Sequence, residues 1–458
     1  MKLTIIGGGS VRTPRLIPSL VHRAERLGLR ELWLMDTDPD KLQLIGGLVT
    51  ALARQHDAPF EIILTTDARE AVTGAQHVIT SIRPGQEQGR ATDERIAFAH
   101  GVLGQETTGA AGFAMAMRSI PALMEYARLV EEAGAPNAWI YNFTNPAGLV
   151  AQALHYAGIQ RVVGICDSAN GAQHAVSRYL EVPLKRVFHE VYGLNHLSWT
   201  RSVRVDADEH GEGGEEVFPA LLHDDRFVQS THMSMFAPGL RQWQNAFLNE
   251  YLHYFYHRDE ALAALLKKPE TRGEEVVRLT GELLSELRSV PTEDADTQLA
   301  IYHRLMGQRS ATYMAHARDG KARASMEPVG EDEEGYAAVA LGCIEAIETN
   351  SPLYTGLNVP NHGMISGLED DDVVEVSCWI DGSGLKPVRI GEVPESQYLL
   401  MRDVKQYERL AARAILQRSR SLAYQALAVH PLLGSYPLAE KLVDAFLNAH
   451  QDLIGTWE

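Results

Sequence analysis

The first third of the chain alternates short apolar runs with amphipathic stretches. The run at 2–6 is rich in β-branched side chains and stops at three glycines, as the buried first strand of a parallel sheet does. A helical pattern covers 14–27, and a second apolar run follows at 31–35. Three more strands are expected further along, at 77–82, 138–142 and 162–165. This alternation predicts a doubly wound parallel α/β sheet.

The pattern changes after residue 165. Helical periodicity dominates 218–349 and is broken by an acidic, polar segment at 292–297. The stretch 206–215 is rich in Gly, Asp and Glu, which is typical of a solvated loop. A β-like run at 373–380 precedes long helical patterns that begin near residue 396.

Together these patterns predict the class α/β with two domains. The first, at 1–165, would be a Rossmann-type doubly wound domain. The second, at 166–458, would be a mixed, largely helical α+β domain, so that the whole resembles a lactate or malate dehydrogenase in architecture.

Composition narrows the class of protein. The chain has 458 residues, 45% of them hydrophobic, and a formal net charge of -18. The acidic balance argues against nucleic acid and anionic membranes as partners, although a few converging arginines would still bind an anionic substrate. Met1 leads directly into the first strand, and no signal peptide or apolar run of membrane-spanning length follows, so a cytoplasmic protein is expected. Three cysteines (Cys166, Cys343, Cys378) are too few for a disulfide framework.

The glycine loop after the first strand is the first candidate site. Gly7, Gly8, Gly9 and Ser10 occupy the position of a dinucleotide-binding loop, and Asp36 ends the second strand, where it would accept hydrogen bonds from an adenosine ribose. A ribose with a free 2′-hydroxyl implies NAD rather than NADP. The loop departs from the usual fingerprint because Arg12 stands at the third glycine position, and Asp36 lies beyond the usual spacing. The alternative is a tight strand-to-helix turn without a ligand.

Polar side chains also follow later strands. The segment 141–148 ends a strand with polar residues and a proline, Cys166 and Asp167 end the next strand, and Asn195-His196 follows further on. A Cys thiolate and a neutral imidazole form a partial ligand set for a divalent transition metal that leaves positions open for substrate oxygens. Taken singly, a Cys at a strand end or a lone His is more often a core residue. Beside a nicotinamide site, the pair points to redox chemistry on a sugar-like carbon.

With these residues in view, the chain resembles glycoside hydrolase family four, and particularly its 6-phospho-β-glucosidase branch. The resemblance runs through nearly the whole length. It is carried by GGGS at 7–10, the segment from Arg83 through Arg90 to Asp93-Glu94-Arg95, GQETTG at 104–109, NFTNPAG at 142–148, GLNHLSW at 193–199, the aromatic run at 251–256, 271–276 and 358–361. So many ordered matches are highly specific.

The resemblance implies an NAD- and manganese-dependent glycosidase, an exception to hydrolysis by two carboxylates. In this family, oxidation at sugar C3 by NAD acidifies the C2 proton, a base removes that proton, the aglycone leaves by elimination, and water adds before C3 is reduced again. Cys166 and His196 match the family's metal ligands, and Tyr251 matches its proposed base. Because free tyrosine has a pKa of about 10, Tyr251 would need a nearby cation to ionise. The alternative is that Tyr251 is a packing residue in an aromatic stripe along a helix.

Further roles follow by position in the motifs. Arg83 and Asn145 match cofactor contacts, and Asn145 also faces the substrate pocket, which would include Arg90, Glu106 and Asn195. Arg272 matches an arginine near a substrate 6-phosphate. Arginine suits this role because its guanidinium donates hydrogen bonds to two phosphate oxygens at once. Arg272 would equally well pair with Glu274 or Glu275. Asp167 would be a general acid if burial raised its pKa, or else a cap at the end of the sheet.

Several positions depart from the family pattern. Asp167-Ser168-Ala169 fits neither the β- nor the α-glucosidase branch, Val11-Arg12 follows the first serine in place of a Ser/Thr-Tyr pair, and Gly307–Ser310 replaces an Arg-Gly-Gly segment. A 6-phospho-α-glucosidase or a glycosidase of non-phosphorylated substrates therefore stays open. So do two other classes, an NAD-dependent 2-hydroxyacid dehydrogenase and a non-catalytic NAD sensor. The expected partner is a small glycoside, and the expected assembly is a homodimer or homotetramer.

Overall fold

The computed structural model describes residues 1–458 apart from 207, 209–210, 212, 292–293 and 319–335. The polar loop expected at 206–215 and the acidic break expected at 292–297 therefore lie partly outside the described residues.

The N-terminal half forms the predicted parallel sheet. Its strands are hydrogen-bonded in the order β3-β2-β1-β4-β5-β6, which is the order of a Rossmann fold. The bounds are β1 Lys2–Ile6, β2 Glu31–Met35, β3 Glu61–Thr65, β4 His77–Thr80, β5 Trp139–Asn142 and β6 Val162–Gly164. The expected strands are confirmed to within two residues. Strand β3 was not foreseen because it lies at the sheet edge, where its side chains are only partly buried.

The sheet continues into the C-terminal half without a break. Strand β11 (Leu353–Pro360) pairs antiparallel with β6 at Asn358 and Gly164, and β12 (Val373–Asp381), β7 (Val187–Leu194), β8 (Leu197–Val205) and β10 (Phe247–Leu248) follow. Two short strands, β9 (Glu215–Glu216) and β13 (Gly384–Pro387), pair with β8 and β12. The expected run at 373–380 is confirmed as β12. The long strands β7 and β11 escaped the sequence pattern because burial on both faces removes the alternation of polar and apolar side chains. In β8 the first four residues are likewise all buried, and exposed side chains appear only from Arg201 onward.

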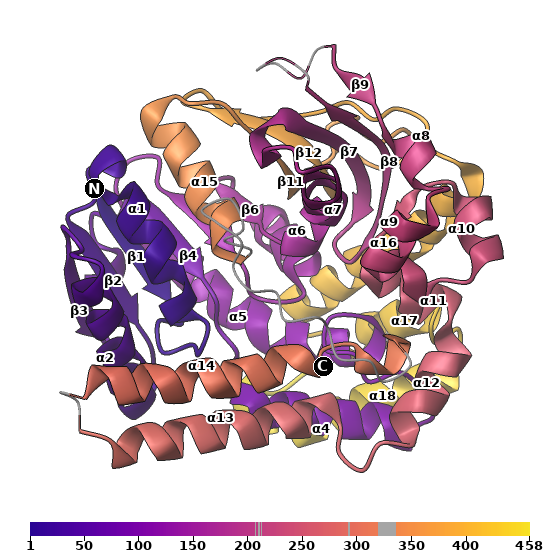
Figure 1. Ribbon diagram of the computed structural model, residues 1–458. Coiled ribbons are helices and arrows are strands. Elements are labelled where there is room, and N and C mark those ends of the chain that lie inside the picture. Colours follow the sequence, from indigo (N-terminus) through magenta and orange to yellow (C-terminus); the bar gives the residue numbers. More distant parts are fainter. Residues whose placement is uncertain (207, 209–210, 212, 292–293, 319–335) are drawn as a thin grey trace.

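Helices cover both faces of this sheet (Figure 1). Helix α1 (Ile17–Leu27), preceded by η1 (Thr13–Leu16), packs against α2 (Pro39–Gln55) and α15 (Tyr336–Thr349), whereas α5 (Gly109–Ala133) packs against α3 (Ala68–Val72), α4 (Gln86–Ala99) and α6 (Ala147–Tyr156). The C-terminal helices return to the N-terminal half: α16 (Glu395–Gln417) and α17 (Arg420–Val429) contact α5, and α18 (Tyr436–Ala449), followed by α19 (Gln451–Ile454), contacts α4.

The helices between β8 and α15 form the remaining part of the C-terminal half. Helices α13 (Arg272–Ser289) and α14 (Ala295–Ala311) lie side by side next to α2 (Figure 1). The shorter elements are α7 (Gly171–Leu180), α8 (Phe218–Leu221), α9 (Asp225–Ser230), α10 (Pro238–Gln244), α11 (His253–Tyr256), α12 (Arg258–Leu266) and the 3₁₀ turns η2 (Asp167–Asn170), η3 (Leu184–Arg186), η4 (His232–Met235), η5 (Glu250–Leu252) and η6 (Ala315–Arg318).

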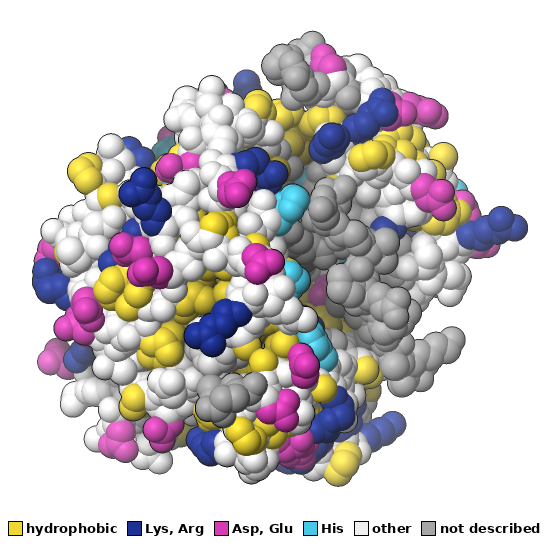
Figure 2. Space-filling view, turned by 60° about the vertical axis from the view of Figure 1, so that its left-hand side comes forward, with side chains coloured by type: hydrophobic (Ala, Val, Ile, Leu, Met, Phe, Trp, Pro, Cys, Tyr) yellow, Lys and Arg dark blue, Asp and Glu magenta, His cyan; other side chains and the backbone are white. Residues whose placement is uncertain are grey.

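One large apolar core extends through both halves of the described chain. Within those residues, no helix has both the length and the apolar character to cross a membrane. On the face drawn in Figure 2, acidic and basic side chains of the described residues are interspersed and form no continuous basic surface.

Candidate active site

The glycine loop is packed too closely for side chains. Gly7 has a φ of +89°, and a Cβ atom on it would lie 2.3 Å from the carbonyl oxygen of Ser81 at the end of the neighbouring strand. A Cβ on Gly8 would lie 2.7 Å from that of Leu34. The loop backbone therefore lies directly on the sheet. Because its glycines have no side chains, the phosphates of a ligand can approach the loop closely.

Asp36 stands beside this loop at the end of β2. Its carboxylate accepts hydrogen bonds from the backbone N–H groups of Gly9, at 2.9 Å, and Asp38, at 3.1 Å. The side chain is partly exposed. A carboxylate held at this point, next to a loop that excludes side chains, fits the adenosine half of a dinucleotide.

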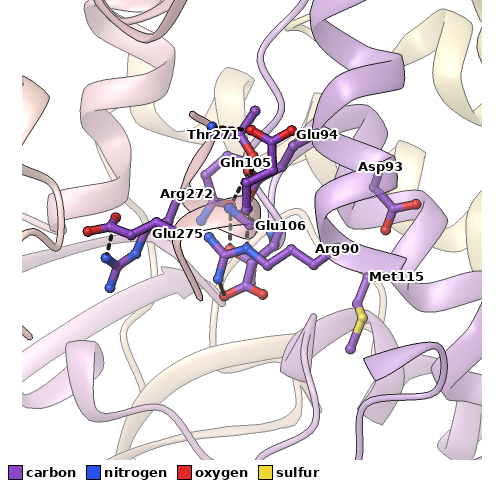
Figure 3. Close-up of polar contacts among 12 residues, drawn as sticks. Arg90, Asp93, Glu94, Gln105, Glu106, Met115, Thr271, Arg272 and Glu275 are labelled. Atoms are coloured by element: carbon purple, nitrogen blue, oxygen red, sulfur yellow. Dashed lines mark hydrogen bonds and ion pairs between the residues drawn. The ribbon is translucent and has the colours of Figure 1, made fainter. Parts of the chain in front are cut away.

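A cluster of arginines and glutamates lies beyond the loop. Glu106 receives ion pairs from Arg83, at 2.5 Å, and Arg90, at 2.8 Å, and Arg90 also pairs with Glu94 at 2.7 Å. Figure 3 shows the Arg90 side chain reaching from its helix toward Glu106 and Glu94. Burial by itself would raise the pKa of Glu106, but Arg83 and Arg90 hold that pKa far below its ordinary range. Glu106 is therefore an anion at every physiological pH.

The expected metal ligands are brought together. The Sγ atom of Cys166, after β6, lies 3.3 Å from Nε2 of His196, which sits in the turn between β7 and β8. Ligand atoms about 2.3 Å (S) and 2.1 Å (N) from a first-row divalent ion lie roughly 3.1 to 3.6 Å apart, so the pair fits adjacent coordination positions. Burial lowers the pKa of His196 to about 4 and raises that of the Cys166 thiol, with Glu375 and Asp167 adding to the second shift. The imidazole is thus neutral, as a metal ligand must be.

No group of three or more metal-binding side chains occurs among the described residues. Cys166 and His196 would therefore supply only part of a coordination sphere. The remaining positions would be open to substrate oxygens, which is the arrangement of a catalytic rather than a structural metal site.

Tyr251 packs directly on this pair. Its ring stacks on the His196 imidazole with centroids 3.9 Å apart, and its hydroxyl accepts a hydrogen bond from Tyr313. Burial raises the pKa of Tyr251 well above 10, and Glu250, Cys166 and Glu106 act in the same direction. Since Glu106 also influences the pKa of His196, the arginine cluster and the thiol–imidazole pair belong to one electrostatic environment.

A polar network behind the metal ligands was not foreseen from the sequence. Glu375, buried on β12, accepts hydrogen bonds from Ser198 (2.6 Å), Asn195 (3.3 Å) and Asn358 (3.2 Å). Burial raises its pKa to about 7 despite these donors. The available signal was a carboxylate between valines near the start of a mostly apolar strand, since such a residue is rarely buried without partners. Asn249, which donates to the hydroxyls of Ser168 and Ser198, carried no such signal.

The local surroundings of three further expected site residues are as follows. Asp167 is exposed at the start of η2, so the described residues do not supply the burial that its role as a general acid requires. Arg272 pairs with Glu275 at 2.8 Å (Figure 3) and donates to the carbonyl of Arg309, while its Nε is buried without a hydrogen-bond partner among the described residues. Asn145 is partly buried and precedes Pro146.

Fold and site together define a class: a doubly wound α/β enzyme whose polar side chains collect at the carboxyl ends of its strands, where such folds bind ligands. A family model described as "Family 4 glycosyl hydrolase" matches residues 2–182, and one described as "Family 4 glycosyl hydrolase C-terminal domain" matches residues 191–433. The chain therefore belongs to family 4 of the glycosyl hydrolases. This confirms the resemblance found in the sequence.

Individual proteins agree with this assignment. A probable 6-phospho-β-glucosidase of Bacillus subtilis is 32% identical over 463 residues, which cover 98% of this chain and 96% of that protein. The 6-phospho-β-glucosidase of Thermotoga maritima, solved with manganese, NAD⁺ and glucose 6-phosphate, is 27% identical and has a TM-score of 0.82 over 99% of both chains. A malate dehydrogenase from Plasmodium falciparum, at 12% identity and a TM-score of 0.52 over 91% of this chain and 99% of that one, shares the fold alone. The predicted fold class is confirmed.

Proposed function

We propose that this chain hydrolyses 6-phosphorylated β-glucosides with NAD and Mn²⁺, or another divalent transition metal, as cofactors. The observation that carries the proposal is the juxtaposition of Cys166, His196 and Tyr251, with Sγ and Nε2 3.3 Å apart and the Tyr251 ring on the imidazole. A dehydrogenase of 2-hydroxyacids would need neither the thiol nor the tyrosine. The names of the Bacillus and Thermotoga proteins support the phosphorylated β-glucoside.

The cofactors have fitting residues in this chain. Cys166 and His196 would hold the metal, and Gly7 to Ser10 with Asp36 would hold the dinucleotide, assisted by Arg83 and Asn145. When bound, NAD supplies a hydride acceptor for sugar C3, and the metal supplies positive charge that stabilises the C2 and C3 oxygens and lowers the pKa of Tyr251.

Side chains of the protein would transfer protons and hold the sugar in position. Tyr251 would remove the C2 proton, because it is an ionisable residue whose ring packs directly on the proposed metal ligand His196. Arg90 and Glu106 are fixed by their mutual ion pair and would present rigid polar groups to the sugar hydroxyls. Asn195 would add a further polar group, because hydrogen bonds with Gly148 and Glu375 hold its side-chain amide in place. Rigid placement of this kind lowers the entropic cost of reaching the transition state.

Two roles in the proposal concern the ends of the substrate. Arg272 would contact the 6-phosphate, since its Nε is a buried donor without a partner among the described residues. Asp167 would protonate the departing aglycone. Asp167 is exposed in the protein alone, so bound substrate would have to cover it for this role.

The test is a panel of four nitrophenyl glucosides, α or β and with or without a 6-phosphate, assayed with NAD and Mn²⁺. We expect turnover of the β-anomer that carries phosphate. Turnover of the α-anomer, or of the β-glucoside without phosphate, would assign the alternative branch. Absence of turnover with all four would overturn the proposed function. The assembly into a homodimer or homotetramer stays a prediction, which the molecular mass in solution tests.

A further inference from the structure

Helix α14 is fastened to the end of the glycine loop. The Tyr302 hydroxyl donates a buried hydrogen bond of 2.9 Å to the backbone carbonyl of Val11. Two turns further along the helix, Arg309 lines a small cavity together with Val11. Residues nearly 300 positions apart in the sequence thus meet beside the loop that we propose binds NAD.

Arg309 is a buried cation with no carboxylate ion-pair partner among the residues that the structure describes. Its side chain is 9% exposed, and its Nη1 atom makes no hydrogen bond within the described part of the chain. Arg83 and Arg90 each have an ion pair with Glu106, whereas no ion pair of Arg309 occurs among the described residues. Burial, together with Arg12 and Arg83, lowers the pKa of Arg309 to about 9; Glu87 opposes this shift, and Arg90 adds to it. The guanidinium therefore stays charged at neutral pH.

An unpaired buried charge is costly, and proteins keep one where a ligand completes it. Arg309 lies in the last turn of α14, where a cation also interacts favourably with the helix dipole. The helix dipole does not explain why Arg309 is buried near other arginines, because an exposed arginine in the last turn would interact with the dipole equally well. Burial beside Arg12 and Arg83 is explained by an anion that binds among the three.

The structure places Arg309 against Val11 and close enough to Arg12 for their charges to interact. Two basic residues from distant parts of the chain therefore lie together at the end of the glycine loop. The ligand group at the end of a Rossmann glycine loop is the pyrophosphate of the dinucleotide.

We propose that Arg309, acting beside Arg12, is a pyrophosphate-binding residue that reaches the dinucleotide from the C-terminal half of the chain. This inference rests on the proposed function in one respect, namely that the glycine loop binds NAD. Arg309 would then select ligands that carry the pyrophosphate, because its planar guanidinium can donate hydrogen bonds to two phosphate oxygens at once.

The experiment compares Arg309→Met with wild type by calorimetric titration of the full-length protein. The matched control is Arg304→Met, since Arg304 is an exposed residue of the same helix paired with Glu286. Three ligands separate the parts of the cofactor: NAD, ADP-ribose, which keeps the pyrophosphate, and adenosine, which lacks it. Loss of one charge-assisted interaction predicts about 10- to 100-fold weaker binding of NAD and ADP-ribose, and unchanged binding of adenosine.

A second readout needs no ligand. If the charge is unpaired in the ligand-free protein, Arg309→Met raises its Tm, whereas a purely structural arginine would lower it. NAD affinity within twofold of wild type would overturn the inference, and so would weakened binding of glucose 6-phosphate with NAD binding intact. If Arg309→Met does not fold, Arg309→Gln is titrated with the same three ligands. Weaker binding of NAD and ADP-ribose would support the inference, and NAD affinity within twofold of wild type would overturn it. Wild type that binds no NAD would instead refute the proposed function.

Discussion

Cys166 and His196 come from different strand ends, and the fold places Sγ of one 3.3 Å from Nε2 of the other. Each has a further support: Ser168 Oγ lies 3.0 Å from the thiol, and the Tyr251 ring lies on the imidazole. The thiol, the imidazole and the phenol form the centre on which the predictions below depend.

The first prediction concerns the metal ligands. Cys166→Ser and His196→Asn should lose Mn²⁺ binding and reduce turnover at least 100-fold, with NAD affinity unchanged, because neither residue belongs to the glycine loop. Asn is chosen because His196 has a φ of +65°, a conformation that Asn tolerates better than Ala. Bound manganese is measured by electron paramagnetic resonance. Cys343→Ala, in the core of α15, is the control and should retain the metal. Retention of one equivalent of Mn²⁺ by either ligand variant would disprove that assignment.

The second prediction concerns the base. Tyr251→Phe keeps the ring that stacks on His196 but removes the ionisable oxygen, so kcat should fall about 10²- to 10⁴-fold while Tm stays close to that of wild type. Tyr256→Phe, in the same aromatic run, should keep kcat within twofold. Deuterium from D₂O should enter C2 of the wild-type product and should enter slowly with Tyr251→Phe. Equal exchange rates in the two proteins would assign the proton to another group.

A third prediction follows from His430. Burial lowers its pKa to about 3, and its Nδ1 accepts a hydrogen bond from the Leu432 N–H, which requires the neutral ring. The unfolded chain takes up a proton near pH 6.5, so this group's contribution to stability is complete above that pH and declines as the pH falls toward 3. His430→Asn keeps a hydrogen-bond acceptor for the Leu432 N–H but has no side chain that titrates in this range. As the pH falls from 6 to 4.5, the free energy of unfolding of wild type should decrease relative to that of the variant by about 1.4 kcal/mol per pH unit, measured by urea unfolding. A difference that is independent of pH would contradict the assignment, and exposed His56→Asn is the control.

The fourth prediction has the opposite sign. Burial raises the pKa of Glu375 to about 7, above its ordinary value of 4.5, so the carboxyl stabilises the fold fully below pH 4.5 and progressively loses this contribution as the pH rises through 7. Glu375→Gln cannot ionise. In metal-free protein, its stability relative to wild type should therefore increase by about 1.4 kcal/mol per pH unit between pH 5 and 7. A constant difference over that range would show that Glu375 is ionised throughout.

The sequence by itself determined the elements that local pattern controls. The apolar run before Gly7, the carboxylate of Asp36 at the next strand end and the motif residues Cys166, His196 and Tyr251 were all identifiable. The parallel strands other than β3 were predicted to within two residues. These features depend on neighbours in the chain, since strand periodicity and turn chemistry are local properties.

Only the tertiary structure decided which distant residues meet. Glu375 reaches Asn195 across 180 positions, and Tyr302 fastens α14 to Val11 across 291, while neither strand β12 nor helix α14 carries a mark of its partner. Periodicity shows which face of an element is buried but not against what it is buried. The same limit applies to charge: the sequence shows that Arg309 is basic, but packing decides that it is buried without an ion pair among the described residues. Pairing between separated elements is set by the whole core, and a one-dimensional pattern does not contain it.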